Sequence, residues 1–224
     1  MIAQIQRFIK AHRSLVFLAL SFITLYLAGA LFIELAEEVL EGEGFYIDRL
    51  IEDALVLEES QGLYTFYSWV TELGSAWFLI VASLVTVLVL VKFYQQRFLV
   101  TLFLINMAGT SGLTLLLKQF FGRDRPNVIE ALDGIGYSFP SGHATGAMAF
   151  YGFLIFLVVI SHQTRTIKIS LSILLSMIII NVMMSRVFLH VHYFTDVVAG
   201  ATLSFIWLGV SILSILYIWR RKRI

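Results

Sequence analysis

Two stretches of the sequence combine residue types that could do chemistry on a phosphate ester. They run from Lys118 to His143 and from Ser185 to Asp196, in a chain that is otherwise rich in apolar runs. Ionisable side chains are costly in membrane-spanning regions, and there they usually mark a functional site. The candidate residues are Lys118, Arg125, Pro126, Pro140, Ser141, Gly142, His143, Ser185, Arg186, His192 and Asp196. Fixed cations, two histidines, a carboxylate and a Ser-Gly turn are what a histidine nucleophile needs to attack phosphorus.

Two of the cations lie close together at the end of a predicted helix. Arg125 follows Lys118 by seven residues, beyond Gly122, in a loop that would bring both charges to one surface. Arginine offers a planar fork that matches phosphate oxygens, and lysine offers a compact charge. Snorkelling to the membrane interface is the alternative interpretation, above all for Lys118 alone. The neighbouring motifs favour phosphate binding.

The run Pro140-Ser141-Gly142-His143 precedes an apolar span. Ser141 is well placed as the N-cap of that helix, whose free N–H groups and positive dipole end would bind an anion. Gly142 would let the backbone approach the anion closely. A purely structural cap explains Ser141 and Gly142 but leaves His143 unexplained, because a charged imidazole in the first turn is disfavoured unless an anion is bound.

His192 and Asp196 are four residues apart, which places an imidazole and a carboxylate on one helical face. A carboxylate that binds one ring nitrogen fixes the tautomer and leaves the other nitrogen for attack. His190 is a nearby competitor. Its neighbour four residues back is Arg186, which provides no acceptor to orient the ring, so we interpret His190 as an interfacial residue.

A metal site built from the same histidines and carboxylate is a further alternative. A divalent ion would meet unfavourable charge beside several cations, so we expect neither a metal nor another cofactor. The chain has no cysteine, which excludes a thiolate site.

The elements that must position these residues are membrane-spanning helices. Of the 224 residues, 59% are hydrophobic and 14% are charged, against about 25% charged in soluble domains. Apolar runs of this length predict spans rather than buried core helices. We predict one all-α domain over residues 1–224 with six spans, at residues 14–33, 75–93, 98–117, 143–161, 169–188 and 197–218.

The charges predict the orientation of the spans. An even number of spans places both termini on one side, where most lysines and arginines also fall, and the positive-inside rule makes that side cytoplasmic. Every aspartate and glutamate falls on the other side. We therefore expect the active-site loop, residues 118–142, to face the extracytoplasmic side. The first span resembles a signal peptide, but its apolar continuation favours an uncleaved anchor.

Residues 34–72 form an acidic segment between the first two predicted spans. Apolar residues from Ile47 to Leu55 recur there at helical spacing, with Asp48, Arg49, Glu52 and Asp53 between them. This pattern predicts a helix on the outer membrane interface. Its carboxylates could bind a cation, but a solvated polar face is the favoured interpretation.

The motifs resemble a known family. Lys118 to Pro126 fits K-x6-R-P, residues 140–143 read P-S-G-H, and Ser185 to Asp196 fits S-R-x5-H-x3-D. These are the three signatures of the type 2 phosphatidic-acid phosphatase superfamily, and the six-span layout resembles its membrane branch. The motifs cover about a third of the chain, and all their positions match in order.

This resemblance implies a role for each residue. His192 would attack phosphorus to give a phosphohistidine, Asp196 would orient it, and His143 would act as general acid and base. The phosphate oxygens would be held by Lys118, Arg125, Ser141, Gly142 and Arg186. The resemblance implies a metal-independent phosphatase of the bacterial cell membrane.

The substrate remains open among phosphatidylglycerophosphate, undecaprenyl pyrophosphate and phosphatidic acid. A lipid phosphotransferase that passes the phosphoryl group to an acceptor other than water is an alternative. A transporter or scaffold that binds lipid phosphates without hydrolysis is a remote one. Membrane lipids are the expected partners, and neither nucleic acid nor an obligate protein partner is expected.

Overall fold

The computed structural model describes residues 13–42, 44–55, 62–94, 97–126, 132 and 136–222. Its elements are α2 (Arg13–Glu41), α3 (Tyr46–Leu55), α4 (Gly62–Glu72), α5 (Ala76–Val89), the π-helical turn η1 (Leu90–Tyr94), α6 (Arg97–Phe121), α7 (Gly142–Ile160), α8 (Arg165–Phe188) and α9 (Phe194–Lys222). No strand occurs among these described residues. The predicted all-α class is therefore confirmed.

Most of the helices are long and apolar enough to cross a membrane. Five qualify singly: Leu15–Glu41, Arg97–Phe121, Gly142–Ile160, Arg165–Phe188 and Phe194–Ser214. Gly62–Glu72 and Ala76–Lys92 qualify together as one span that bends by 44°. Counted in this way, the described residues contain the six predicted spans.

The boundaries around the acidic segment differ from those predicted. α2 continues to Glu41, eight residues beyond the predicted end of the first span, because glutamate is a good helix former and does not stop a helix that leaves the apolar layer. α4, predicted as part of the interfacial segment, is the first half of the bent span. Only α3, within the described part of this segment, is the short amphipathic helix that the pattern predicts.

α7 is the central helix of the bundle and packs against α6, α8 and α9. Its side chains share an apolar core with the neighbouring helices, centred on Phe103, Phe150 and Phe153. α9 comes very close to the start of α7 at Gly200, where a β-carbon would lie 2.6 Å from the Ser141 carbonyl oxygen. A glycine is therefore required for this helix contact, which ties the two halves of the candidate site together.

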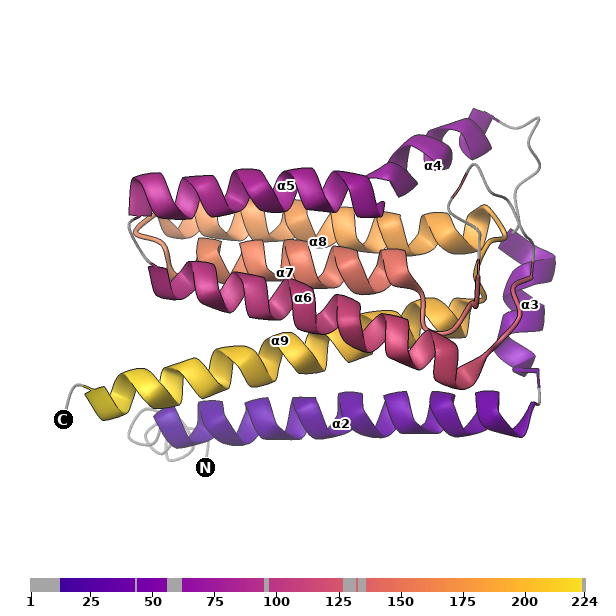
Figure 1. Ribbon diagram of the computed structural model, residues 1–224, viewed down its shortest axis with the longest axis horizontal. Coiled ribbons are helices and arrows are strands. Elements are labelled where there is room, and N and C mark those ends of the chain that lie inside the picture. Colours follow the sequence, from indigo (N-terminus) through magenta and orange to yellow (C-terminus); the bar gives the residue numbers. More distant parts are fainter. Residues whose placement is uncertain are drawn as a thin grey trace, which may run out of the picture.

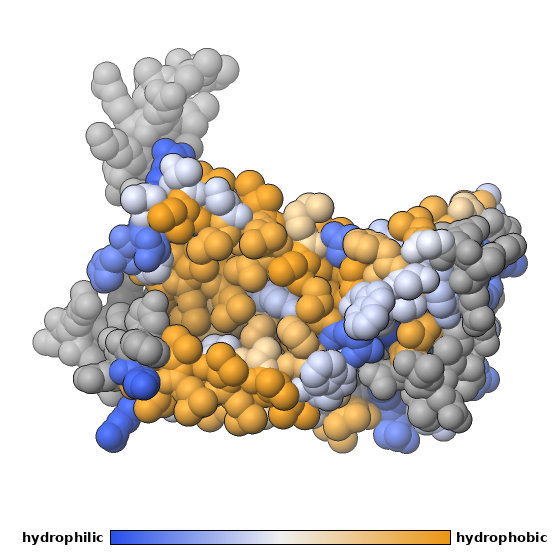
Figure 2. Space-filling view, turned by 90° about the horizontal axis from the view of Figure 1, so that it is seen from above, coloured by the Kyte–Doolittle hydropathy of each residue, from blue (hydrophilic) through white to orange (hydrophobic). Residues whose placement is uncertain are grey.

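The two ends of the bundle differ in what they carry. α2 begins and α9 ends at one end, and α3 lies across the opposite end, beside the loop that joins α6 to α7 (Figure 1). In the space-filling view, hydrophilic residues gather toward both ends and an apolar surface lies between them (Figure 2). The motif residues thus lie at the end away from the start of α2 and the end of α9.

Candidate active site

His192 and Asp196 form a buried pair where α8 gives way to α9. Nδ1 of His192 lies 3.3 Å from Oδ2 of Asp196, and both side chains are almost completely inaccessible to solvent. The same carboxylate oxygen accepts a hydrogen bond of 3.0 Å from the backbone N–H of Tyr193, the residue before α9. A carboxylate that reaches back to the N–H before its own helix is fixed by the helix start. The predicted pairing is present.

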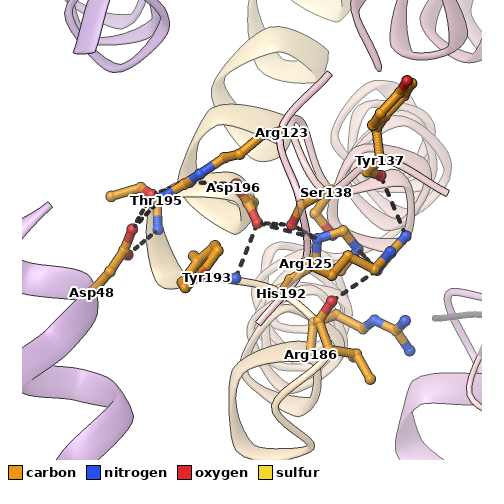
Figure 3. Close-up of polar contacts among 12 residues, drawn as sticks. Asp48, Arg123, Arg125, Tyr137, Ser138, Arg186, His192, Tyr193, Thr195 and Asp196 are labelled. Atoms are coloured by element: carbon orange, nitrogen blue, oxygen red, sulfur yellow. Dashed lines mark hydrogen bonds and ion pairs between the residues drawn. The ribbon is translucent and has the colours of Figure 1, made fainter. Parts of the chain in front are cut away.

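The contact with Arg125 indicates which nitrogen of the His192 ring carries the proton. Its Nη1 atom lies 2.9 Å from Nε2 of His192, and a guanidinium can only donate hydrogen bonds. Nε2 is therefore the acceptor, and the proton of the neutral ring is on Nδ1, facing Asp196 (Figure 3). Burial and the charges of Arg125 and Arg186 hold the pKa of His192 well below its ordinary value of 6.5.

Ser138 is a site residue that the sequence analysis missed. Its hydroxyl donates a short hydrogen bond to Oδ2 of Asp196 and lies 3.2 Å from Nδ1 of His192. The hydroxyl thus joins the two members of the pair and gives the Nδ1 proton a second acceptor. Ser138 lies two residues before Pro140, and this proximity to a motif is the only sequence signal of its role.

Arg123 and Asp48 were also missed. Arg123 donates to Oδ1 of Asp196 at 2.6 Å and to Oδ2 of Asp48 at 3.0 Å. Asp48 is buried, so the favoured interpretation of the α3 carboxylates as a solvated face is wrong for this residue. The helical pattern placed Asp48 on the polar side of α3, where this side chain faces the start of α9 rather than water. Sequence spacing within one helix does not reveal a partner on another.

Backbone carbonyls of the loop between α6 and α7 bind both cations of the first motif, Lys118 in the last turn of α6 and Arg125 in the loop itself. Lys118 donates a short hydrogen bond to the carbonyl of Tyr137 and a bond of 3.3 Å to that of Ser138. Arg125 donates to the carbonyls of Gly136 and Val191, each at 2.7 Å. Both side chains are therefore oriented by backbone acceptors of the same loop and of the turn before His192.

The start of α7 brings the second motif to this cluster. Ser141 is at the N-cap position as predicted, but its side chain makes no capping bond. Its hydroxyl is buried and has no hydrogen-bond partner among the described residues. Its backbone N–H instead donates to the Asp196 carbonyl at 3.0 Å. Gly142 lies against Lys118, whose Cε would be 3.9 Å from an added β-carbon.

Arg186 is buried to 0% exposure at the end of α8. Its guanidinium donates to the Thr71 hydroxyl and to the Leu132 carbonyl, each at 2.7 Å. Its backbone carbonyl accepts from the N–H of His192 at 3.2 Å. The backbone of Arg186 therefore helps to position His192, and, together with burial and Arg125, its charge lowers the pKa of the ring.

His190 has a partner that its own helix did not indicate. Its Nε2 lies 2.6 Å from Oε1 of Glu52 on α3, and both side chains are partly exposed. The expectation that His190 has no orienting acceptor is therefore wrong, since the acceptor comes from a distant segment. The pair lies at the partly exposed edge of the site, as the interfacial interpretation implies.

A cavity of about 750 Å³ lies between α5 and α6 along α7. Lys118, Arg125, Gly142 and His143 line it at the motif end, and most other lining residues are apolar. Some of these residues, such as Leu84, Leu104 and Leu115, are also exposed on the lipid-facing surface. The cavity therefore connects the charged cluster with the apolar exterior of the bundle.

Fold and geometry together define a helical, multi-pass membrane protein with a buried histidine–carboxylate pair beside a cluster of fixed cations. The chain belongs to the PAP2 superfamily, whose model matches residues 99–222, more than half of the chain. The resemblance inferred from the three motifs is confirmed, and the chain is a membrane phosphatase of this lipid phosphatase family.

Individual relatives support the same assignment. The chain is 28% identical over 162 residues to phosphatidylglycerophosphatase B of Bacillus subtilis, covering 70% of this chain and 77% of the relative. It is also similar to the crystal structure of a transmembrane PAP2-type phosphatidylglycerolphosphate phosphatase from Bacillus subtilis. The TM-score is 0.73 at 27% identity, over 88% of this chain and 96% of that chain. Aquifex aeolicus LpxE shares the fold, with a TM-score of 0.53 at 24% identity, over 74% of this chain and 92% of that one.

Proposed function

We propose that this chain removes the terminal phosphate of a membrane lipid by forming a phosphohistidine on His192. The orientation of the ring carries the proposal. Nε2 faces the Arg125 guanidinium while Nδ1 faces Asp196 and Ser138. The lone pair of Nε2 therefore points toward a fixed cation, and a fixed cation is where an anionic phosphate group binds.

Each proton has a defined place in the reaction. Nε2 of His192 attacks phosphorus, and the bond from phosphorus to the lipid oxygen breaks as that oxygen takes a proton from His143. A water molecule then attacks the phosphohistidine and gives a proton to His143, which releases phosphate and restores Nε2. Asp196 stabilises the positive ring that exists between the two steps. The covalent intermediate divides one difficult displacement into two easier ones.

The cations and the start of α7 stabilise the transferring phosphoryl group. Lys118 and Arg125 line the cavity beside His143, and Arg186 adds a buried charge behind His192. The Ser141 hydroxyl and the Gly142 N–H add donors at the positive end of a helix. Arg125 moves from Nε2 to the phosphate oxygens when substrate binds, which frees the nucleophile. Such fixed charge is the main source of catalysis in phosphoryl transfer.

Phosphatidylglycerophosphate is the proposed substrate. The name of the Bacillus subtilis relative supports this choice, and the apolar cavity beside the cations suits a lipid whose chains stay in the membrane layer. Both termini are proposed to be cytoplasmic and the site to face the extracytoplasmic side, since the site lies at the bundle end away from the start of α2 and the end of α9 (Figure 1).

Two assays on the purified protein in detergent test the proposal. Quenching in alkaline detergent during turnover with phosphatidylglycerophosphate radiolabelled in its terminal phosphate should trap a base-stable, acid-labile phosphoprotein that His192→Ala does not form. The ratio kcat/KM should be higher for phosphatidylglycerophosphate than for undecaprenyl pyrophosphate or phosphatidic acid, and another order would reassign the substrate. A labelled, phosphorylated acceptor in place of free phosphate, formed only when a lipid acceptor is added, indicates a phosphotransferase. Lipid-phosphate binding without any turnover indicates a transporter or scaffold.

A further inference from the structure

Arg123 lies between two carboxylates from helices far apart in the sequence. One arm of its guanidinium, Nη1, reaches Oδ1 of Asp196 at 2.6 Å, and the other, Nη2, reaches Oδ2 of Asp48 at 3.0 Å. Both carboxylates are buried and only 14% of the Arg123 side chain is exposed. Figure 3 shows the guanidinium between α3 and the first turn of α9, on the opposite side of Asp196 from His192.

We propose that Arg123, held in place by Asp48, is a positioning residue that fixes the Asp196 carboxylate and thereby sets the orientation and charge of the His192 imidazole. This role rests on the proposed function, since it assigns to Arg123 the support of the nucleophile. Arg123 occupies an unspecified position of the first motif, and Asp48 lies outside all three motifs.

The hydrogen bonds of Asp196 show why one oxygen depends on Arg123. Oδ2 receives the Ser138 hydroxyl, the Tyr193 N–H and the His192 ring. Oδ1 receives its hydrogen bond from Arg123. A buried carboxylate is stable only when its charge is paired and its oxygens are bonded. Without Arg123, Oδ1 would lose its charged donor and the carboxylate would be held through Oδ2 alone.

Asp48 in turn fixes Arg123 and the start of α9 together. Its two oxygens accept from the backbone N–H of Thr195 at 2.9 Å and from the Thr195 hydroxyl at 2.6 Å. A carboxylate beside the first turn of a helix is favoured by the helix dipole. The same hydroxyl accepts a bond of 2.9 Å from Arg123. Asp48, Thr195 and Arg123 therefore form a closed network around the base of Asp196.

Aromatic rings define the plane of the guanidinium. Its central carbon lies 4.3 Å from the centre of the Tyr193 ring and 5.2 Å from that of Phe45. A planar, delocalised cation stacks on such rings and can donate along two directions at once, whereas the ammonium of lysine is a point charge. The site therefore requires an arginine, and Arg123→Lys is not a conservative change here.

Removal of Arg123 and removal of Asp48 should have opposite effects on the protonation of His192. The positive charge of Arg123 opposes a charged imidazole, and Asp48 neutralises part of that charge. Other ionisable groups around the ring stay constant in such a comparison. They are Glu52 on α3, Lys118 on α6, Arg125 in the following loop, His143 on α7, Arg186 on α8, His190 in the turn and Asp196 on α9.

The experiment compares Arg123→Gln, Arg123→Lys and Asp48→Asn with wild type, with Arg49→Gln as the matched control. Arg49 is exposed and lies next to Asp48 on α3, and its guanidinium donates to the Gly44 carbonyl. We expect kcat to fall about 10²-fold in Arg123→Gln and in Arg123→Lys with KM nearly unchanged, less than the roughly 10⁴-fold loss seen when a triad carboxylate is replaced. The control should keep wild-type kcat.

The pH dependence of kcat/KM separates positioning from a general loss of structure. Its acid limb reports protonation of the nucleophile in the free enzyme. The limb should move to higher pH in Arg123→Gln and to lower pH in Asp48→Asn, because the first removes a positive charge and the second a negative one. Partial unfolding would lower the fraction of active enzyme, but it would not move the acid limb in opposite directions in the two variants.

Two results would overturn the positioning role. One is an acid limb that stays in place, or moves in the same direction, in both variants. The other is a wild-type kcat in Arg123→Gln. The failure of the proposed function looks different, because the wild-type chain would then form no phosphohistidine. A wild-type phosphoenzyme together with unmoved limbs rejects the role of Arg123 alone. Should Arg123→Gln give no folded protein, Arg123→Lys tests the loss of kcat and Asp48→Asn tests the movement of the acid limb to lower pH. A wild-type kcat in the first, or an unmoved limb in the second, would then overturn the role.

Discussion

Arg125 contacts Nε2 of His192 at 2.9 Å, on the side of the ring opposite to Asp196. The two nitrogens of the imidazole therefore have different hydrogen-bonding roles before any substrate is bound. One nitrogen donates its proton toward a carboxylate and the other presents a lone pair to a cation. Protonation of Nε2 would place two positive groups against each other, so the geometry favours the neutral ring.

Replacement of His192 should cost more activity than replacement of Asp196. His192→Ala should abolish phosphate release. Asp196→Asn should lower kcat by about 10²- to 10⁴-fold, because the ring loses its charged acceptor while the Ser138 hydroxyl still faces Nδ1. Steady-state kinetics on folded, purified variants measure both effects. Near-normal turnover by His192→Ala would contradict the mechanism.

The activity should also respond to acid in a defined way. Because burial and the Arg125 charge lower the pKa of His192 below 6.5, the acid limb of kcat/KM should lie below pH 6.5. Activity is thus kept as the pH falls through 6.5 and is lost only when the lowered pKa is reached. Arg125→Gln should move the limb upward, whereas Arg97→Gln, at the start of α6, should not. A wild-type limb above pH 6.5 would contradict the assignment.

The sequence predicted the helical class, the spans and the residues of the three motifs because these depend on local composition and spacing. Apolar runs identify membrane helices without knowledge of their neighbours, and the spacing of His192 and Asp196 within one turn predicted their contact. The N-cap position of Ser141 was predicted in the same way, from the residue type that precedes an apolar run.

Residues that act across helices could not be predicted in this way. Asp48 and Glu52 are on α3, and their partners Arg123 and His190 come from segments more than seventy positions away. Nothing in the spacing of α3 reveals which face meets α9. The bend between α4 and α5 was also missed. Gly74 lies at this break and packs against Val182, leaving no room for a β-carbon, and this contact between distant segments is not visible in the spacing.

Activity should be independent of divalent metal ions. The positive charge that a metal would supply comes from Lys118, Arg125 and Arg186, which are oriented by backbone and hydroxyl acceptors. Phosphate release should therefore persist in EDTA, and orthovanadate, which adopts a five-coordinate geometry, should inhibit it. The measurement is activity after dialysis against chelator, with and without added Mg²⁺ or Mn²⁺. Loss in chelator and recovery with one of these ions would show that a metal takes part.

The orientation in the membrane can be tested with single cysteines, since the chain has none of its own. Arg49 and Gln163 are both exposed, and they lie on α3 and between α7 and α8, at opposite ends of the bundle (Figure 1). A membrane-impermeant maleimide added to intact cells should label Arg49→Cys and miss Gln163→Cys. Permeabilised cells provide the control, where both should react. The reverse pattern would place the active site in the cytoplasm.

The cavity between α5 and α6 should bind the apolar part of the substrate. Ser111 lines it on α6, and a tryptophan at this position would fill space that a lipid chain needs. We expect Ser111→Trp to lower kcat/KM for a long-chain lipid phosphate by about 10- to 100-fold, a loss of roughly 1.4 to 2.7 kcal/mol of transition-state stabilisation. Hydrolysis of a water-soluble short-chain phosphate should change little, because the cations and histidines remain in place.

Leu116→Trp is the matched control for this prediction. Leu116 lies further along the same helix, is 69% exposed and is not among the residues that line the cavity. A tryptophan there faces the membrane and should leave both substrates unaffected. Equal loss for long-chain and short-chain substrates in Ser111→Trp would indicate damage to the catalytic end of the cavity. Unchanged kinetics for the long-chain lipid would show that its chains bind elsewhere on the bundle.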